Sequence, residues 1–469
     1  MRIIISNTKW VFVFITILIA LYIEFAYFLE RSDFLKLFLI WTLLSTVTYI
    51  VVEKCKPTFI VLVIISLLLR LLFIKATPNL SQDFYRFIWD GRMLWAGYNP
   101  YLTLPQTWIE NGNAPILEAE SLYRGMGPMN ASHFTNYPPI SQLIYWISAW
   151  IDKANLVNAM IAIRSVLIIT DLAIIYIGSK LLKILQLPAR RIFWYILNPF
   201  IIIELTGNLH FEGVMVFFLL TGLFYLHKKQ WMIAGICMGL SISVKLIPLL
   251  LLPVFIQYLT KNKYVLNKFR DNQFKFPFLF YLSTIITVTL SFLPFLSVQF
   301  LQNFSQTINL WFQSFEFNAS IYYIFRWIGY QVKGWNIIAT LGPVLSICGI
   351  LSILLISFLK NNLKSNDLIT GLLFSICIYY LFATTVHPWY LTIPLVLSIF
   401  TRYRFVQVWC FVIVLSYTAY IYPTYQENLL MVCFEYVIVA LVLISELYPN
   451  EHLKQRLLKH FKRIHLLLG

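Results

Sequence analysis

The amino-acid sequence predicts an all-α fold, a polytopic transmembrane helical bundle of about 12–14 membrane segments. Of its 469 residues, 59% are hydrophobic and only 12% are charged, and the mean hydropathy is +0.75. Soluble domains are about 45–50% apolar, so the composition alone indicates a membrane protein. Apolar runs recur along the chain, and they lack the roughly ten-residue alternating segments of a membrane β-barrel.

The first apolar run extends from Trp10 to Leu29, about 20 residues, which is long enough to span a bilayer. Charged residues follow it without the small-residue pattern of a cleavage site, so we interpret it as an uncleaved first helix. Backbone groups in lipid must be paired within their own segment, so each apolar run is expected to be helical. The runs are 10–29, 35–52, 58–75, 138–151, 156–179, 192–207, 212–227, 231–259, 276–300, 335–359, 368–385, 389–401, 405–421 and 429–448.

The net charge of +16 comes from 36 basic and 20 acidic residues. In a soluble protein this excess would suggest nucleic-acid binding, but here the basic residues lie mostly in short loops between apolar runs, as in loops retained in the cytoplasm. If the loop 261–275 and the C-terminal tail are cytoplasmic, the other basic loops fall on the same side. Successive loops alternate between the two sides of the membrane, so this assignment requires that the segment 138–151 be re-entrant or lie flat. It also requires that the run 231–259 break into two short helices near Pro248.

We therefore expect one integrated transmembrane domain over residues 1–450, followed by a basic amphipathic cytoplasmic tail over 451–469. Large loops at 76–137 and 301–334 then face the opposite side, together with the turns at 204–213 and at His387. The six cysteines are scattered, with no spacing typical of a zinc site or of a disulfide framework.

The stretch SQDFYRFIWDGRMLWAGYNPY, residues 81–101, places two acids and two arginines among aromatic residues directly after an apolar run. In a helix, Asp83, Arg86 and Asp90 share a face, and the glycine and proline at 97 and 100 should end that helix. An interfacial helix with an aromatic belt is the alternative, but belts favour Trp and Tyr beside basic residues rather than two aspartates. We expect the arginines to keep a carboxylate ionised here, as suits chemistry on a charged, lipid-linked substrate.

The stretch ELTGNLHFEG, residues 204–213, contains more ionisable groups than a turn requires. Glu204, His210 and Glu212 would be costly at membrane depth, so they indicate a functional site, although a lone histidine is more often structural. The segment NYPP, which ends at Pro139, is by itself a helix-start signal.

Lys245 is the only charged residue in the run SVKLIPLLLLP. A lysine in hydrocarbon costs about 2.5–3.5 kcal/mol on insertion scales, so Lys245 either snorkels to the interface or meets an anion such as a phosphate. In FNASIYYIFRWIGY, Arg326 suits bidentate phosphate binding. In VHPWYL, Trp389 and Tyr390 suit stacking on the apolar face of a sugar.

Taken in order, the motifs QDFYRFIWDGRMLWAGYNPY, NYPP, LNPFIIIELTGNLHFEG, VKLIPLLLLP, FNASIYYIFR and HPWY resemble those of GT-C superfamily integral-membrane glycosyltransferases. The resemblance spans residues 81–390 and is closest to bacterial polyprenyl-phosphate-mannose-dependent mannosyltransferases. Two features differ from that family. Gln82 stands where relatives have the first of two adjacent acids, and 208–212 reads NLHFE where relatives often have an NGHND-like turn.

The resemblance implies an inverting transfer of a sugar, expected to be mannose, from a polyprenyl phosphate to a hydroxyl of a glycolipid, glycan or protein. The reaction would occur at the outer face of the cytoplasmic membrane. Asp83 and Asp90 are the expected catalytic residues, with Asp83 as the general base. No cofactor and no nucleic-acid partner are expected, and metal dependence is left open. The residues expected to bind substrate are Arg86, Arg92, Tyr137, Glu204, Asn208, His210, Glu212, Lys245, Asn318, Arg326, His387, Trp389 and Tyr390.

Other function classes explain the residues less well. A transporter or flippase places its ionisable groups near the bilayer midplane, often in paired repeats, whereas here they gather in loops on one side. A purely structural protein would not need Asp83 or Lys245. A polymerase or ligase with a lipid diphosphate donor is not separated from the main hypothesis by sequence.

Overall fold

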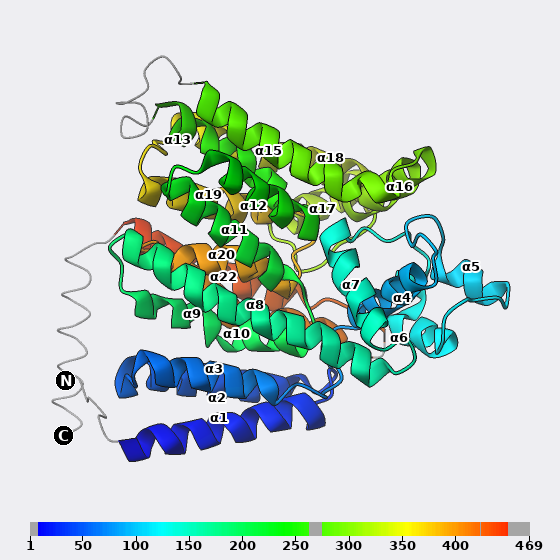
Figure 1. Ribbon diagram of the computed structural model, residues 1–469, viewed down its shortest axis with the longest axis horizontal. Helices are drawn as coiled ribbons and strands as arrows, with labels where there is room; N and C mark the ends of the chain where they lie inside the picture. Colours follow the sequence, from blue (N-terminus) through cyan, green and yellow to red (C-terminus); the bar gives the residue numbers. More distant parts are fainter. Residues whose placement is uncertain (1–7, 262–273, 423, 449–469) are drawn as a thin grey trace.

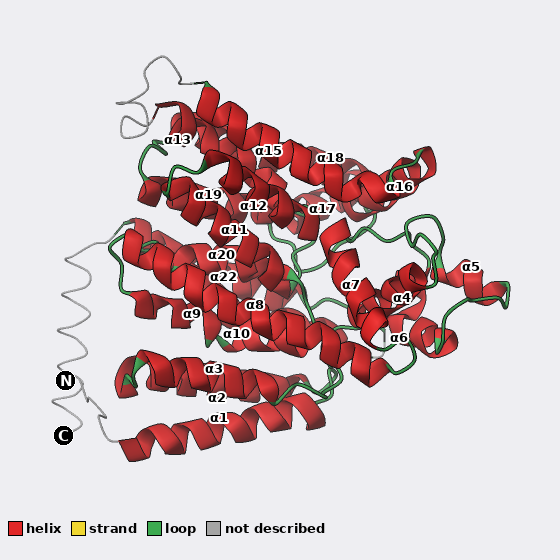
Figure 2. Ribbon diagram, in the orientation of Figure 1, coloured by secondary structure: helices red, strands yellow, loops and turns green. Residues whose placement is uncertain are grey.

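The computed structural model describes residues 8–261, 274–422 and 424–448, and the regular structure in these ranges is helical, as the sequence predicts. The long helices run side by side along the long axis of the molecule, while several short helices gather at one end (Figure 1). Figure 2 shows helices joined by loops throughout, and the described residues contain one isolated parallel bridge, between Phe317 and Thr385, but no strand.

Seven described helices are long and apolar enough to cross a membrane. They expose large apolar side chains on the outside of the bundle, which suits contact with lipid. They are α1 (Thr8–Phe28), α2 (Phe34–Tyr49) continued by η1 (Ile50–Cys55), α8 (Leu156–Ile184), α15 (Lys275–Phe292) continued by η6 (Leu293–Phe295), α18 (Ile338–Leu359), α19 (Ser365–Phe382) and α22 (Leu429–Leu447).

Shorter apolar helices fill the rest of the bundle. They are α3 (Phe59–Leu71), α12 (Trp231–Val244), η4 (Ile247–Val254) with α13 (Phe255–Lys261), η7 (Pro388–Leu391) with α20 (Thr392–Ser398), and α21 (Phe405–Val412) with η8 (Ile413–Tyr420). A further span is bent by 115° where Pro199–Gly207 meets Glu212–His227. It comprises α10 (Pro199–Ile201), η3 (Ile202–Gly207) and α11 (Glu212–His227), and is preceded by η2 (Ala189–Ile192) and α9 (Phe193–Ile196).

Six helices lie in the two large loops and the segment after the first of them. The loop 76–137 holds α4 (Asp83–Trp95), α5 (Pro105–Glu110) and α6 (Ala119–Ala131), and the loop 301–334 holds most of α16 (Val298–Gln313) and α17 (Ile321–Lys333). The segment 138–151 forms α7 (Pro139–Ile151), which packs against α4 and α8 and does not cross the bundle (Figure 1). This agrees with the assignment of the basic loops to one side of the membrane.

Local sequence explains the main helix boundaries. The apolar run 231–259 breaks as predicted, because α12 ends at Val244, Lys245 is extended, and Pro248 lies at the start of η4. Helix α4 ends at Trp95, after which Gly97 adopts φ +84°, a conformation that only glycine reaches without strain. Pro138 and Pro139 begin α7, as the NYPP signal indicates.

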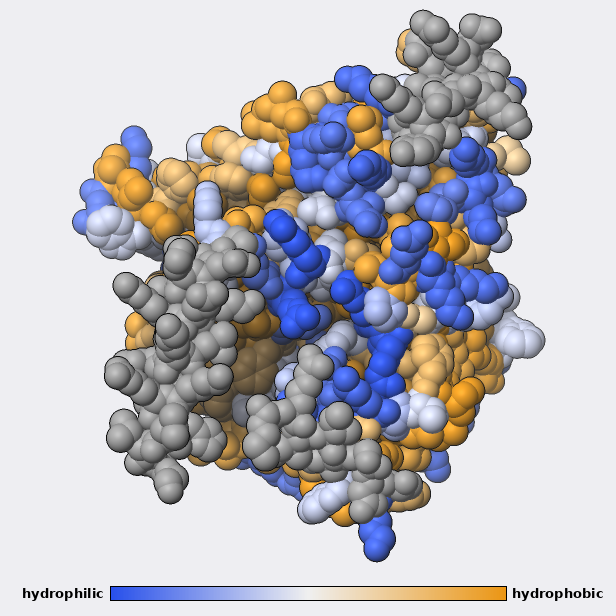
Figure 3. Space-filling view, turned by 90° about the vertical axis from the view of Figure 1, so that its left-hand side faces the viewer, coloured by the Kyte–Doolittle hydropathy of each residue, from blue (hydrophilic) through white to orange (hydrophobic). Residues whose placement is uncertain are grey.

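The end of the molecule opposite α4–α7 carries hydrophilic side chains between apolar flanks (Figure 3). Here α8 and α11 end and α15 begins, so the basic loops after α8 and α11 lie at this end (Figure 1). The predicted tail 451–469 and most of the loop 261–275 lie outside the described residues. The polar loops 76–137 and 301–334 are thus separated from the basic end by the length of the bundle.

Candidate active site

A cavity of about 770 Å³ lies at the end of the bundle where the short helices gather, a size typical of ligand sites. Segments far apart in sequence form its wall: the α1–α2 turn, the start of α4, the loop before α7, the start of η4, the end of α16, and the residues after α19 and η8. Six of the predicted site residues line it: Asp83, Tyr137, Lys245, His387, Trp389 and Tyr390.

Asp83 is the first residue of α4, and its side chain is 23% exposed. Asn130 Nδ2 lies 3.3 Å from Oδ1 and Tyr137 Oη lies 3.4 Å from Oδ2, and the first turn of α4 favours negative charge. Burial raises the pKa of Asp83 above its usual value, and the positive charge of Lys245 opposes this rise. The carboxylate is therefore more basic than an exposed aspartate and faces the cavity.

Two polar links hold the start of α4 beside the turn that precedes α11. Arg164 of α8 is fully buried and donates hydrogen bonds of 2.8–3.1 Å to the backbone carbonyls of residues 74, 76, 206 and 207. Asn208 Oδ1 accepts a bond of 3.2 Å from the Leu80 N–H. Because both partners are fixed in the core, these links determine where Asp83 lies.

Glu204 and Asn208 are completely buried and do not line the cavity. Glu204 Oε1 accepts a bond of 2.6 Å from Tyr417 Oη, and Oε2 accepts one of 3.3 Å from Asn208 Nδ2. Neither residue is in place to touch a substrate directly, which corrects the expectation from sequence. Glu204 instead orients Tyr417, which does line the cavity.

His210 lies behind Asp83 and is also completely buried. The sequence predicts that His210 contacts substrate, but the residue does not line the cavity. Its Nδ1 is 2.9 Å from the Glu204 carbonyl oxygen, and since a carbonyl only accepts, Nδ1 carries the proton. Its Nε2 lies 4.0 Å from Asp83 Oδ2, beyond hydrogen-bond distance, and has no hydrogen-bond partner among the described residues.

The HPWY segment forms an aromatic stack beneath the cavity. The rings of His387 and Trp389 are 4.5 Å apart at 10°, and Trp389 also contacts His210 at 3.8 Å. Trp389 is only 9% exposed, so it leaves little ring face for a sugar. Burial lowers the pKa of His387 to about 3, so this ring is neutral near pH 7. Tyr390 also lines the cavity, packs edge-on against His387 at 5.4 Å and stacks on Tyr380 at 5.9 Å.

Lys245 already has an internal counter-ion. Its Nζ is 2.7 Å from Glu212 Oε1, and the Glu212 side chain is fully buried while that of Lys245 is 16% exposed. The ammonium also lies 5.6 Å from the centre of the Tyr137 ring. The charge of Lys245 is therefore balanced by Glu212 without snorkelling and without a phosphate. Glu212 acts as the counter-ion of Lys245 and does not line the cavity.

Asp90, Arg86 and Arg92 serve the structure of the loop 76–137. Arg86 Nε binds Asp90 Oδ1 at 2.8 Å, and Asp90 is completely buried and also accepts from Gln142. Arg92 binds Glu118 at 2.9 Å and the Leu117 carbonyl at 2.6 Å. None of the three lines the cavity, and Arg86 pairs with Asp90 rather than with Asp83, so this geometry does not support the catalytic role expected of Asp90.

Asn318 and Arg326 are likewise engaged elsewhere. Asn318 adopts φ +47°, is completely buried, and its Nδ2 donates to Glu435 Oε1 at 3.1 Å. Arg326 Nη1 is 2.5 Å from Glu316 Oε1, and neither Asn318 nor Arg326 lines the cavity. Asn318 thus anchors the loop 301–334 to α22, and this geometry does not support the substrate contacts expected of Asn318 and Arg326.

Sequence reasoning missed the cavity residues from outside the recognised motifs. Arg31, in the turn between α1 and α2, lines the cavity, as do Tyr417, Tyr420 and Tyr425. A signal for the tyrosines was the dense aromatic stretch YTAYIYPTY at the end of the penultimate span. Arg31 carried no such signal, because a charge after a first apolar run is ordinary.

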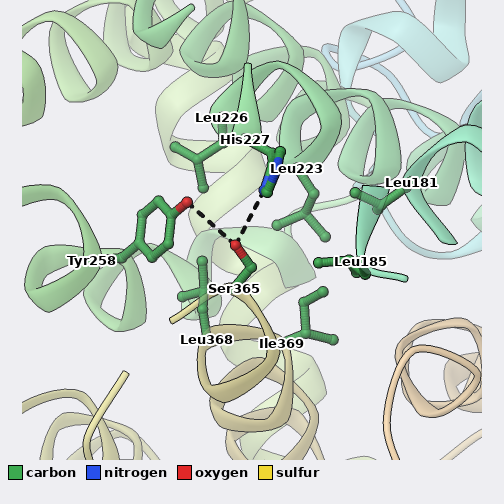
Figure 4. A pocket seen from close by; sticks show the side chains of 9 residues that line it. All are labelled: Leu181, Leu185, Leu223, Leu226, His227, Tyr258, Ser365, Leu368 and Ile369. Carbon is green, nitrogen blue, oxygen red and sulfur yellow. Dashed lines mark hydrogen bonds between the residues drawn. The ribbon is translucent and has the colours of Figure 1, made fainter. Parts of the chain in front are cut away.

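A second cavity, of about 10 Å³, has room for roughly one water molecule. Figure 4 shows its apolar lining and the Ser365 hydroxyl, which lies 3.2 Å from His227 Nδ1 and 3.4 Å from Tyr258 Oη. These contacts join α11, α13 and α19, so they serve packing. In the described part of the chain, no three His, Cys, Asp or Glu side chains come together to form a possible metal site.

Comparison with known proteins relates the chain to mannosyltransferases. Over 184 residues the chain is 24% identical to the alpha-(1->6)-mannopyranosyltransferase A of Corynebacterium glutamicum. The aligned residues make up 38% of this chain and 35% of that protein. The alignment therefore spans about a third of the relative's length. Residues 26–261, which include Arg31, Asp83, His210 and Lys245, match the family described as alpha-(1->6)-mannopyranosyltransferase, N-terminal domain. The chain belongs to this mannosyltransferase family.

Proposed function

We propose that this protein transfers mannose from a polyprenyl phosphate donor to an acceptor hydroxyl, with inversion at the anomeric carbon. The acceptor is a hydroxyl of a glycolipid, glycan or protein, and the site faces the outside of the cytoplasmic membrane. Family membership supports mannose as the sugar. The donor, the stereochemistry and the acceptor class are argued below from the cavity.

The observation that carries this proposal is the two-part lining of the cavity. One part holds Asp83, Lys245 and Arg31, and the other is apolar, with side chains from η4 and α16. Leu249 of η4 lines the cavity and is 52% exposed. A lipid-linked sugar phosphate has the same division into a charged head and an apolar tail, and its tail can approach sideways from the bilayer.

The catalytic step follows from the position of Asp83. Its carboxylate accepts the proton of the acceptor hydroxyl while that oxygen attacks the anomeric carbon of mannose. The bond from the anomeric carbon to the phosphate oxygen breaks, and its electron pair leaves with the phosphate. The proton then rests on the Asp83 carboxyl, which is partly exposed and can release it to water in the cavity.

A single displacement explains why one carboxylate suffices. A double displacement needs a second carboxylate as nucleophile. Besides Asp83, the carboxylate among the cavity-lining side chains is Glu316, and it is bound to Arg326, Tyr322 and Asn336. With one free carboxylate the attack inverts the anomeric carbon, so an α-linked product, as in the family's description, requires a β-linked donor.

The test uses purified protein in nanodiscs with short-chain polyprenyl phosphate mannose, polyprenyl phosphate glucose or GDP-mannose, and an α-1,6-linked mannose oligosaccharide as acceptor. We expect mannose transfer from the polyprenyl phosphate donor, an α-linkage by NMR, and loss of product with Asp83→Asn. Transfer from GDP-mannose alone, or movement of the intact donor across the bilayer without a product, would refute the proposal.

The side of the membrane is tested separately. Asn113 and Asn361 are exposed and lie at opposite ends of the bundle, so single cysteines there, in a variant lacking the exposed Cys433, report orientation. A membrane-impermeant reagent applied to intact cells should label the cysteine at Asn113 and leave the one at Asn361 unmodified. The reverse pattern would place the cavity on the cytoplasmic side.

A further inference from the structure

The ionisable side chains that line the cavity are almost all neutralised within the protein. Lys245 is paired with Glu212, and Glu316 with Arg326. His387 is neutral near pH 7, because burial lowers its pKa to about 3. In the described part of the chain this leaves the carboxylate of Asp83, which serves the acceptor, and the guanidinium of Arg31.

Arg31 has no carboxylate partner among the described residues. Its Cζ lies 3.1 Å from the centre of the Tyr420 ring, so the planar guanidinium rests on the ring face. The guanidinium is also hydrogen-bonded to the Tyr420 side chain, so Tyr420 fixes its position at the cavity wall. The Nε atom is buried and has no hydrogen-bond partner in the described residues, which is costly unless a ligand supplies one.

We propose that Arg31 is the principal contact of the donor phosphate, an inference that rests on the proposed polyprenyl phosphate donor. A guanidinium presents its N–H donors in a fork that matches two phosphate oxygens. Tyr420 orients the fork, and the α1–α2 turn places it at the wall of the cavity. Lys245 and Arg326, the cations that the sequence suggests for this role, are held by Glu212 and Glu316.

The chemistry explains why a free cation is useful at this point. In the donor the phosphate is a diester with one negative charge. When the bond from the phosphate oxygen to the anomeric carbon breaks, that oxygen keeps the electron pair, and the phosphate approaches two negative charges. A fixed guanidinium therefore binds the leaving group more tightly than the ground state, which lowers the barrier as well as improving donor binding.

The kinetic test compares Arg31→Gln, Arg31→Lys and the control Arg402→Gln. Arg402 is also an arginine over a tyrosine ring, 5.1 Å from Tyr403, but it lies in the loop between α20 and α21, away from the cavity. For Arg31→Gln we expect donor kcat/KM to fall about 10–100-fold, the value of a hydrogen bond to a charged group, with acceptor KM unchanged. Arg31→Lys should recover part of the loss, and Arg402→Gln should match wild type.

A second test needs no variant and so does not depend on folding. Phenylglyoxal modifies accessible arginines, and mass spectrometry measures the modification at Arg31 and Arg402. Farnesyl phosphate should protect Arg31 and leave Arg402 modified, whereas farnesol and phosphatidylglycerol at the same concentrations should not protect. Equal protection by farnesol, or by the bulk phospholipid, would overturn the assignment to the donor phosphate.

The two proposals fail in different ways. If wild type makes no product from polyprenyl phosphate mannose, the proposed function fails. If wild type is active while Arg31→Gln keeps the wild-type donor KM and kcat, the function stands and the assignment of Arg31 is wrong. A uniform loss of donor and acceptor binding in Arg31→Gln, not recovered by Arg31→Lys, would reduce Arg31 to a structural role through Tyr420.

Discussion

The close contact between α4 and α7 at Gly91 predicts a distant effect on catalysis. A Cβ atom added at Gly91 would lie 2.1 Å from the backbone oxygen of Tyr145. Backbone atoms cannot rotate out of the way, so α4 must move by roughly 1 Å before this contact becomes an ordinary one. Asp83 lies on the same helix, about two turns away, and moves with it. Since a misplacement of about 1 Å can reduce a rate about 100-fold, we expect a similar fall in kcat for Gly91→Ala.

The assay measures initial rates of mannosyl transfer on protein that elutes as a single species in detergent, with both substrates at saturation. The matched control is Gly222→Ala in α11, where the added Cβ would lie 3.3 Å from the Ala234 oxygen. This position also makes an alanine in a helix interior, but it requires a shift of only a few tenths of an ångström. We expect Gly222→Ala to retain activity within about threefold of wild type.

A folded Gly91→Ala protein with wild-type kcat would refute this reasoning, because it would mean that the α4–α7 contact does not position the carboxylate. A fall of equal size in Gly222→Ala would refute it too, since the effect would then follow from bundle stability and not from the displacement of Asp83.

Four further outcomes are expected. Asp83→Asn should lower kcat about 10²–10⁴-fold with unchanged thermal unfolding, because it keeps the shape and removes the base. In wild type, kcat should fall as the pH drops through the pKa of Asp83, which burial raises, so the acid limb should lie above the usual aspartate range in a pH–rate profile. Lys245→Met should move this acid limb to higher pH, because the positive charge that opposes the rise in the Asp83 pKa is lost. The same variant should destabilise the fold by about 3–5 kcal/mol, because Glu212 is left buried without its counter-ion. The double variant Lys245→Met, Glu212→Gln should regain stability in denaturation experiments. Arg164→Met should cost at least about 4 kcal/mol in the same experiments, because four buried carbonyl oxygens lose their donor.

The sequence was informative about Asp83 and Lys245 for different reasons. Asp83 opens a helix directly after an apolar segment, and such a local arrangement survives folding unchanged. Lys245 was correctly recognised as needing an anion, but the choice between a phosphate and a carboxylate depended on which segment lies opposite, and Glu212 lies there. The structure does not support the expected substrate contacts of Asn318 and Arg326, because Asn318 donates to the distant Glu435 and Arg326 is paired with Glu316 in its own loop.

The sequence by itself determined the helical class, the membrane segments, the break at Lys245, the non-crossing segment 138–151 and the family motifs. These follow from apolar length, proline and glycine positions and the need to pair backbone groups in lipid, all of which act over one helix or one turn. The tertiary structure alone decided which charges remain free. Asp90 is paired within α4 and Arg326 within the loop 301–334, whereas Lys245 and Glu212 are neutralised by pairing between distant segments. These pairs leave Asp83 and Arg31 facing one cavity. A charge in a low-dielectric interior acts through its nearest partner, and that partner is known only when the helices are assembled.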